Sequence, residues 1–218
     1  MAATKHMQKT ATRVGHRPLE TISLRQLFDH RYFRLALLVL AGGMLVLSIF
    51  LPYWHITLYA PQYPKGLTVD AYVTHLTGDV REVDGLNHYI GMIKLSNAAP
   101  FERTISRFAI PVIALLAIAS FWIRNRWKWL AVIPVLMYPL AFIIDLFAWL
   151  YYAGHSLDPH AALSRSINPF TPHILGIGRI GQFHTDATFA IGFYFALIAA
   201  VLAFVAVFLE RKREREAD

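Results

Sequence analysis

Four long apolar stretches interrupt the polar sequence, at residues 34–54, 108–123, 129–152 and 188–209. A membrane-spanning helix needs about 20 mostly apolar residues to cross a hydrocarbon core of roughly 30 Å. Aromatic residues such as Trp54, Trp122 and Tyr152 lie at the ends of these stretches, as is typical of side chains at the membrane–water interface. The pattern therefore predicts four transmembrane helices.

The two connections at residues 55–107 and 153–187 are long enough to carry structure of their own. In the first, residues 55–63 and 67–76 predict two strands, the second because apolar and polar side chains alternate along it. The sequence Tyr63-Pro64-Lys65-Gly66 predicts the turn between them. Residues 83–95 predict a short helix or a tight loop.

The second connection is rich in proline and glycine, so irregular structure over the top of the helices is expected. The fold class that follows is an all-α membrane protein. It consists of a four-transmembrane-helix bundle with a small β-containing extracytoplasmic loop domain.

Composition agrees with a bilayer and excludes several kinds of chemistry. Of the 218 residues, 56% are hydrophobic and 16% are charged, against roughly 25% charged residues in soluble domains. The chain contains no cysteine, which excludes disulfides, thiolate zinc sites and cysteine nucleophiles. P-loop, H-E-x-x-H and G-x-S-x-G motifs are absent from the sequence, so ATPase, zincin and serine-hydrolase functions lack support.

Basic residues are distributed unevenly and predict the orientation. Residues 1–34, 124–128 and 210–218 carry 14 of the 21 lysines and arginines. Basic segments stay in the cytoplasm, so we expect a multi-pass protein of the bacterial inner membrane with both ends, 1–33 and 210–218, inside. This topology and lipid contacts explain the net charge of +7 without a nucleic-acid partner. The first apolar stretch is too long for a signal peptide and lacks a small-residue cleavage site.

Seven of the ten histidines fall in the two outward connections: His55, His75, His88, His155, His160, His173 and His184. Neutral imidazole is the commonest metal ligand in proteins, so a metal site is one interpretation. The alternative is that each histidine is a polar interfacial residue that caps a loop or contacts lipid head groups.

The segment from Asn87 to Met92 (NHYIGM) carries the sharpest local pattern. If it is helical, His88 and Met92 lie one turn apart on one face. An imidazole beside a thioether suits Cu(I), because soft ligands select it. Gly91 argues against a helix, and in the alternative Met92 packs beneath the loop while Asn87 and His88 hydrogen-bond to the strands.

Asp145 stands in the third apolar stretch, toward its outer end. A carboxylate at mid-membrane costs about 2.5–3.5 kcal/mol on insertion scales, so such a residue is a functional candidate. Three alternatives stay open for Asp145: a structural acceptor for nearby tyrosines, a site carboxylate, or a protonated and neutral group in a dry environment.

The outward connections resemble those of an uncharacterised bacterial four-helix membrane protein family. Residues 63–67 (YPKGL), Gly78-Asp79 and residues 85–92 (GLNHYIGM) are similar to the outer-loop motif of that family, which reads YPxGL, GD and LNHYIGM. Residues 154–159 (GHSLDP) and 168–172 (NPFTP) are similar to its second loop. The family carries proline where this chain has His173, so His173 is a poor candidate for a shared ligand.

The resemblance implies an accessory protein encoded with maturation factors of nitrous oxide reductase, a periplasmic copper enzyme. It implies a non-enzymatic factor that binds copper or docks a copper-handling partner, either an ABC transporter permease or a periplasmic maturation protein. The expected metal ligands are His88, Met92, His155 and His184. Residues that would support this site or the loops around it are Asn87, Tyr89, Asp145, Asp158, Tyr63 and Gly66.

Two other functions remain open beside copper handling. In the first, the outward connections form a dock for a transporter permease or respiratory enzyme and bind no ligand. In the second, the chain is an enzyme or a small-molecule carrier at the outer leaflet, acting on a quinone or a lipid. An apolar cavity that reaches Asp145 would support the second, and a closed bundle would count against it.

Overall fold

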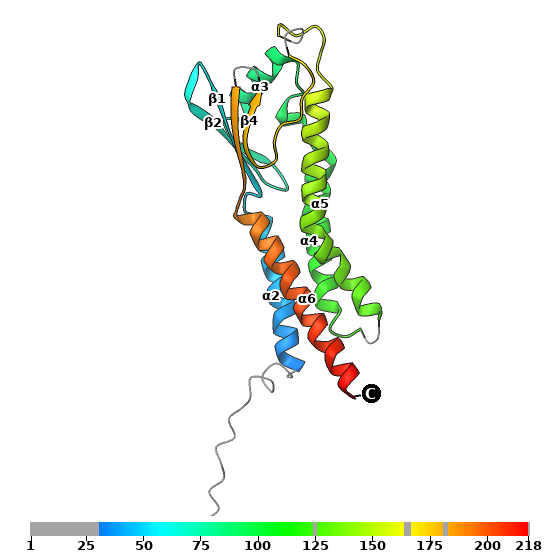
Figure 1. Cartoon of the computed structure of the whole chain (residues 1–218). Coiled ribbons are helices and arrows are strands. Elements are labelled where there is room, and N and C mark those ends of the chain that lie inside the picture. The colour runs from blue at the N-terminus through cyan, green and yellow to red at the C-terminus, as the bar shows by residue number, and fades with distance from the viewer. Residues whose placement is uncertain (1–30, 124–125, 164–166, 181–182, 218) are drawn as a thin grey trace, which may run out of the picture.

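The computed structural model describes residues 31–123, 126–163, 167–180 and 183–217. Most of the expected cytoplasmic N-terminal segment, residues 1–33, lies outside these residues. The molecule is elongated, with helices gathered at one end and a β-sheet at the other (Figure 1). Two of the helices continue upward beside the sheet, so the two parts share one side of the molecule.

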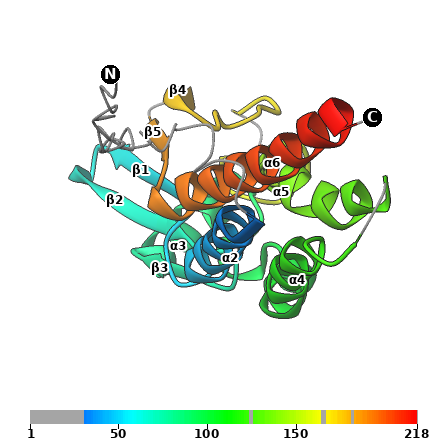
Figure 2. The same cartoon turned by 90° about the horizontal axis from the view of Figure 1, so that it is seen from below.

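Four long helices form the lower part: α2 (Arg31–Ser48), α4 (Pro100–Ala119), α5 (Trp127–His155) and α6 (Ile191–Ala217). Helix α2 packs against α6 and α4, and α5 packs against α6 and α4 (Figure 2). Small residues fill these contacts, because Ala41, Ala117, Ala199 and Ala203 are all fully buried. Short side chains let helix backbones approach closely, as the alanine-rich sequence of α6 indicates.

The sheet combines both outward connections. Its strands are β1 (Trp54–Ala60), β2 (Tyr63–Ala71), β3 (Leu76–Gly78), β4 (Gly176–Ile180) and β5 (Phe183–Phe189). They lie in the order β3-β2-β1-β5-β4, and every neighbouring pair is antiparallel. The second connection, expected to be irregular, thus supplies two of the five strands.

Helix α3 (Val80–Ile90) covers one face of the sheet, and the short helix η1 (Leu95–Asn97) follows it. Leu67 and Val69 of β2 are buried against Val83 and Leu86 of α3. The alternation of apolar and polar residues in β2 predicts this burial, because successive strand side chains point to opposite faces. The other face of the sheet carries polar side chains such as Thr57, Thr68 and Asp186.

The turn between β1 and β2 is displaced from the predicted one. Ala60 pairs with Tyr63, so Pro61 and Gln62 form the turn and Tyr63 already belongs to β2. Gly66 lies within β2 with φ of +82°, beside a register shift in β1. A Cβ at this position would lie 2.6 Å from the Thr57 methyl group, so glycine is required for an irregular strand rather than for a turn.

Tyr53 joins the helices to the sheet and is completely buried. Its hydroxyl group is 2.6 Å from the Ser48 Oγ atom at the end of α2. Its amide donates to the Ala71 carbonyl of β2, and its carbonyl accepts from the Ala190 amide before α6. The position of the sheet relative to α2 and α6 is therefore fixed at this residue.

The predicted fold class, an all-α four-span bundle, is wrong. The chain contains a five-stranded antiparallel sheet, and among the described residues only α5 and α6 are long and apolar enough to cross a membrane. The apolar part of α2, Tyr32–Ser48, is shorter. Helix α4 opens with a polar first turn that includes Glu102 and Arg103, which shortens its apolar part.

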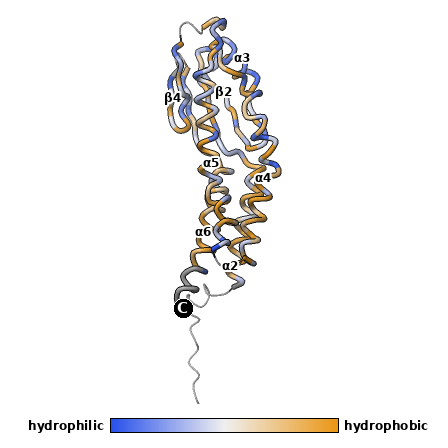
Figure 3. Tube along the Cα trace, turned by 90° about the vertical axis from the view of Figure 1, so that its right-hand side faces the viewer, coloured by the Kyte–Doolittle hydropathy of each residue, from blue (hydrophilic) through white to orange (hydrophobic). Residues whose placement is uncertain are grey.

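The long helices are hydrophobic over most of their length (Figure 3), and many of their large apolar side chains are exposed. In the most apolar 18-residue stretch of α5, only 22% is buried inside the protein, and in that of α6 44% is buried. Leu140 and Ile144 of α5 and Val201 of α6 are all more than half exposed. This arrangement is the reverse of a soluble core helix, which buries its apolar side chains.

Candidate functional site

A cavity of about 370 Å³ lies between α4, α5 and the lower end of the sheet, and we call it the outer cavity. Helix α4 lines it from Glu102 to Ile113, and α5 lines it from Tyr138 to Ala153. Trp54 and Ala71 of the sheet close its inner side. Ile105 stands at the cavity and is 44% exposed, so the outer cavity communicates with the surroundings of the helices.

The wall of the outer cavity is mostly apolar and carries a few polar groups. Asp145 of α5 lines the cavity, as do Glu102 and Arg103 from the first turn of α4. An apolar cavity with a few convergent polar groups is the usual form of a small-molecule site. Of the residues singled out from the sequence, Asp145 is the one that this arrangement supports most directly.

The guanidinium group of Arg103 hydrogen-bonds to the protein backbone. Its two Nη atoms donate to the Leu95 and Ser96 carbonyl oxygens of η1, at 2.9 and 3.1 Å. Asp84 of α3 accepts from the Leu95 amide, so α3, η1 and α4 are tied together at this point. Burial lowers the pKa of the Arg103 guanidinium, and the Asp84 and Glu102 carboxylates oppose this shift, so the group stays charged at neutral pH.

Glu102 is the polar group with unused hydrogen-bonding capacity. Its Oε2 atom is buried and has no hydrogen-bond partner among the described residues. A buried acceptor without a donor costs about 1–3 kcal/mol, more if it is charged. A molecule in the outer cavity that donates a hydrogen bond to Glu102 would remove that cost.

The contacts of Tyr53 with α5 show where Asp145 lies along the long axis of the molecule. The ring of Tyr53 lies 4.9 Å from the ring of Phe142 and 6.2 Å from that of Tyr138. Because Tyr53 marks the junction between helices and sheet, Asp145 lies one turn of α5 above that junction, since a turn advances by about 5.4 Å. The last part of α5 therefore runs beside the sheet.

The NHYIGM segment does not have the helical geometry that would place His88 and Met92 on one face. Helix α3 ends at Ile90, and Gly91 takes a left-handed conformation with φ of +81°. His88 is exposed on α3, whereas Met92 points inward and lines the outer cavity. The alternative interpretation, with Met92 packed beneath the loop, agrees with this placement.

The backbone of this segment holds the second outward connection. The Tyr89 carbonyl accepts from the Leu163 amide at 2.9 Å, and the Gly91 carbonyl accepts from the Asp158 amide at 2.8 Å. Asn87 is buried, its carbonyl accepts from the Met92 amide, and its side chain donates to the Ile93 carbonyl. Asn87, Tyr89 and Asp158 thus act in the loop structure.

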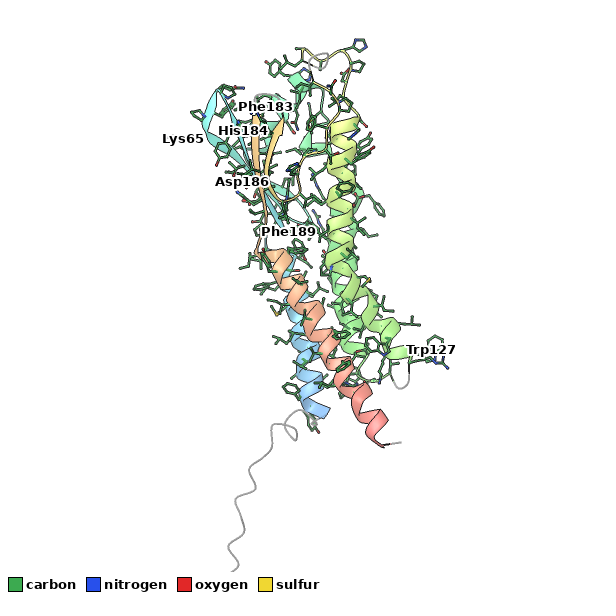
Figure 4. All side chains as sticks on the ribbon, in the orientation of Figure 1. Lys65, Trp127, Phe183, His184, Asp186 and Phe189 are labelled. Carbon is green, nitrogen blue, oxygen red and sulfur yellow. The ribbon has the colours of Figure 1, made fainter. Side chains whose placement is uncertain are left out.

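The remaining predicted ligands lie on separate elements. His155 ends α5, where its ring stacks on Tyr151 with the centroids 4.0 Å apart. His184 is exposed on β5, where it pairs with Tyr59 of β1 and Arg179 of β4 (Figure 4). Across the part of the chain that the structure describes, no three His, Asp or Glu side chains form a group that could hold a metal ion.

Reasoning from the sequence did not identify Glu102 or Arg103 as site residues. Glu102 and Arg103 follow Pro100, which begins α4. Acidic residues in a first helical turn are common because they complement the helix dipole, so the pair carries no distinctive signal. Asp145 differs because a charge inside an apolar stretch is rare.

Comparison with models of known protein families and with curated protein sequences gives no match. The resemblance to the family with the LNHYIGM motif, and the copper-maturation role that it implies, therefore stay predictions.

Proposed function

We propose that this chain is a membrane protein that binds a membrane lipid in its outer cavity, at the outer surface of the bilayer. The observation that carries the proposal is the cavity of about 370 Å³, apolar over most of its wall, with Asp145 and Glu102 on it. Such a cavity supports the small-molecule carrier among the three functions that the sequence left open. A tightly closed bundle would have opposed that function.

The outward-facing apolar surface of α5 and α6 supports the membrane location. Arg34 of α2 and Lys128 of α5 both pair with Glu210 of α6, so these three positions share one end of the molecule. In the sequence these positions adjoin segments rich in lysine and arginine, which favours the cytoplasmic side of a bacterial inner membrane for this end. The sheet then stands on the outer side.

The level of the outer cavity matches the head-group region of such a bilayer. Helix α6 begins at Ile191, directly below the sheet, and its apolar part is 20 residues long, about 30 Å. Tyr53 lies at the upper end of this span and contacts Phe142 of α5. Asp145 lies one turn above Phe142. A carboxylate at the interface costs less than one at mid-membrane.

The polar groups favour a lipid whose head donates hydrogen bonds. Two carboxylates, Glu102 and Asp145, line the outer cavity. The Glu102 Oε2 atom has no hydrogen-bond donor among the described residues. The opposing cation, Arg103, already donates to two carbonyl oxygens. An amine-headed phospholipid such as phosphatidylethanolamine matches this charge pattern better than an anionic phospholipid or a quinone, whose carbonyls only accept hydrogen bonds.

Native mass spectrometry of the full chain in detergent tests this proposal. The unmodified protein should bind phosphatidylethanolamine about tenfold more tightly than phosphatidylglycerol with the same acyl chains. Glu102→Gln and Asp145→Asn should each remove most of this preference, because a hydrogen bond to a charged group is worth about 1.5–3 kcal/mol.

The matched control is Asp158→Asn, which changes an exposed carboxylate away from the outer cavity. It should leave both affinities unchanged. Equal affinity of the unmodified chain for the two phospholipids, or tighter binding of a ubiquinone, would contradict the proposed ligand.

A further inference from the structure

A second, smaller cavity of about 100 Å³ lies between the sheet and α3, and we call it the sheet chamber. Strands β1 and β2 line it with Ile56, Leu58 and Val69, and α3 lines it with Val83 and Leu86. Apolar side chains make up nearly the whole wall. Cavities of about 150 Å³ with such a lining stay dry and bind small apolar molecules such as benzene.

The sheet chamber and the outer cavity share part of their walls. Six residues line both: Trp54, Ala71, Leu76, Met92, Leu95 and Leu150. Among them Ala71 leaves space, and Met92 has a flexible, unbranched side chain that adapts to neighbours. The boundary between the two cavities is therefore made of apolar side chains.

We infer that the sheet chamber receives the end of one acyl chain of the lipid whose head lies near Glu102 and Asp145. This inference rests on the proposed function and adds that the chain bends away from the bilayer, past Met92, and under the sheet. The wall chemistry supports it, since a chamber whose wall is nearly all apolar favours hydrocarbon over a polar ligand.

The volume of the chamber limits how much of the acyl chain it can receive. One water molecule occupies about 30 Å³ in the liquid, and a methylene group is of similar size. The chamber therefore accommodates only a few carbon atoms. The terminal carbons, rather than the middle of the chain, are the part that fits.

Photo-crosslinking of the full chain in phosphatidylethanolamine vesicles tests the inference. One lipid probe carries a diazirine at the end of an acyl chain, and a second carries it near the glycerol. The terminal diazirine should crosslink to residues of the sheet chamber, such as Val69 and Leu86. The diazirine near the glycerol should crosslink to the outer cavity, at residues such as Ile105 and Leu146.

The variant Leu86→Trp fills the sheet chamber and should remove the terminal crosslink while the crosslink near the glycerol remains. Leu115→Trp adds the same ring on the exposed face of α4 and should change neither. A terminal diazirine that reacts only with residues outside the sheet chamber, while the other probe still marks the outer cavity, would overturn the inference alone. If neither probe reacts inside either cavity, the proposed function fails as well.

Discussion

The ring of Tyr53 lies 4.9 Å from the ring of Phe142, and this contact connects the sheet–helix junction to α5. Because Tyr53 also bonds to Ser48, Ala71 and Ala190, one residue fixes α2, β2, α6 and α5 at a common level. Everything on α5 above Phe142, including Asp145, lies beside the sheet. The position of the outer cavity follows from this contact.

Tyr53→Ala should therefore be among the most destabilising single changes. It removes a fully buried ring and its hydroxyl partner, and large-to-small changes of this kind cost about 3–5 kcal/mol. Tyr53→Phe removes only the hydroxyl group and should cost about 1 kcal/mol. Denaturant unfolding of the detergent-solubilised chain measures both. Equal effects of the two variants would show that the ring contacts contribute little.

Gly91→Ala should loosen the second outward connection. Alanine is strained at φ of +81°, and its Cβ would lie 2.8 Å from the Asp158 carbonyl oxygen. We expect a loss of at least 1 kcal/mol and faster hydrogen exchange at the Asp158 and Leu163 amides. Gly85→Ala, in the interior of α3 with nothing within 4 Å, is the control and should stabilise by about 0.5–1 kcal/mol. If hydrogen exchange at these two amides is unchanged in Gly91→Ala, the backbone around Gly91 does not hold the second outward connection in place.

The carboxylate of Glu210 should hold together the end of the helices that lies away from the sheet. It pairs with Arg34 and lies 3.1 Å from the Nζ atom of Lys128, which is 2% exposed. Glu210→Gln leaves these cations without that partner, and breaking a buried ion pair costs about 3–5 kcal/mol. Thermal unfolding in detergent measures the loss. Asp186→Asn, on the exposed face of β5, should change stability by no more than about 0.5 kcal/mol, and an equal effect of both variants would refute this role.

The absence of cysteine from the sequence permits a clean test of orientation. Lys65 lies at the sheet and Trp127 at the start of α5, at opposite ends of the molecule (Figure 4). In spheroplasts, a membrane-impermeant maleimide should label Lys65→Cys directly and Trp127→Cys only after permeabilisation. The opposite pattern, or equal labelling of both, would invert or remove the proposed bilayer placement.

The sequence predicts the strands at β1 and β2 and the apolar helices, but it does not reveal β5. Along β5 the buried positions include Thr185 and Ala187, which are only weakly apolar, so the alternation is hard to recognise. The strand forms because its backbone pairs with β1 and β4, and such long-range pairing overrides local propensity. The same missing information led to the all-α fold class.

The candidate site likewise contains one residue that the sequence predicts and others that it does not. Asp145 is recognisable in the sequence because a carboxylate inside an apolar stretch needs a reason. Glu102 joins it only through the packing of α4 beside α5, which no local pattern encodes. The carbonyl groups of Tyr89 and Gly91 hold the second connection, and backbone contacts of this kind do not depend on the side-chain chemistry that suggested copper ligands.

The most direct test of a lipid-filled outer cavity is to count the lipids that remain with the protein. The full chain, purified in a mild detergent, should retain about one amine-headed phospholipid per molecule by quantitative lipid mass spectrometry. Ala109→Trp, which places an indole ring inside the outer cavity, should retain none, provided that it unfolds at the same temperature as the unmodified chain. Equal retention by both proteins, or no retained phospholipid in the unmodified chain, would contradict the proposed function.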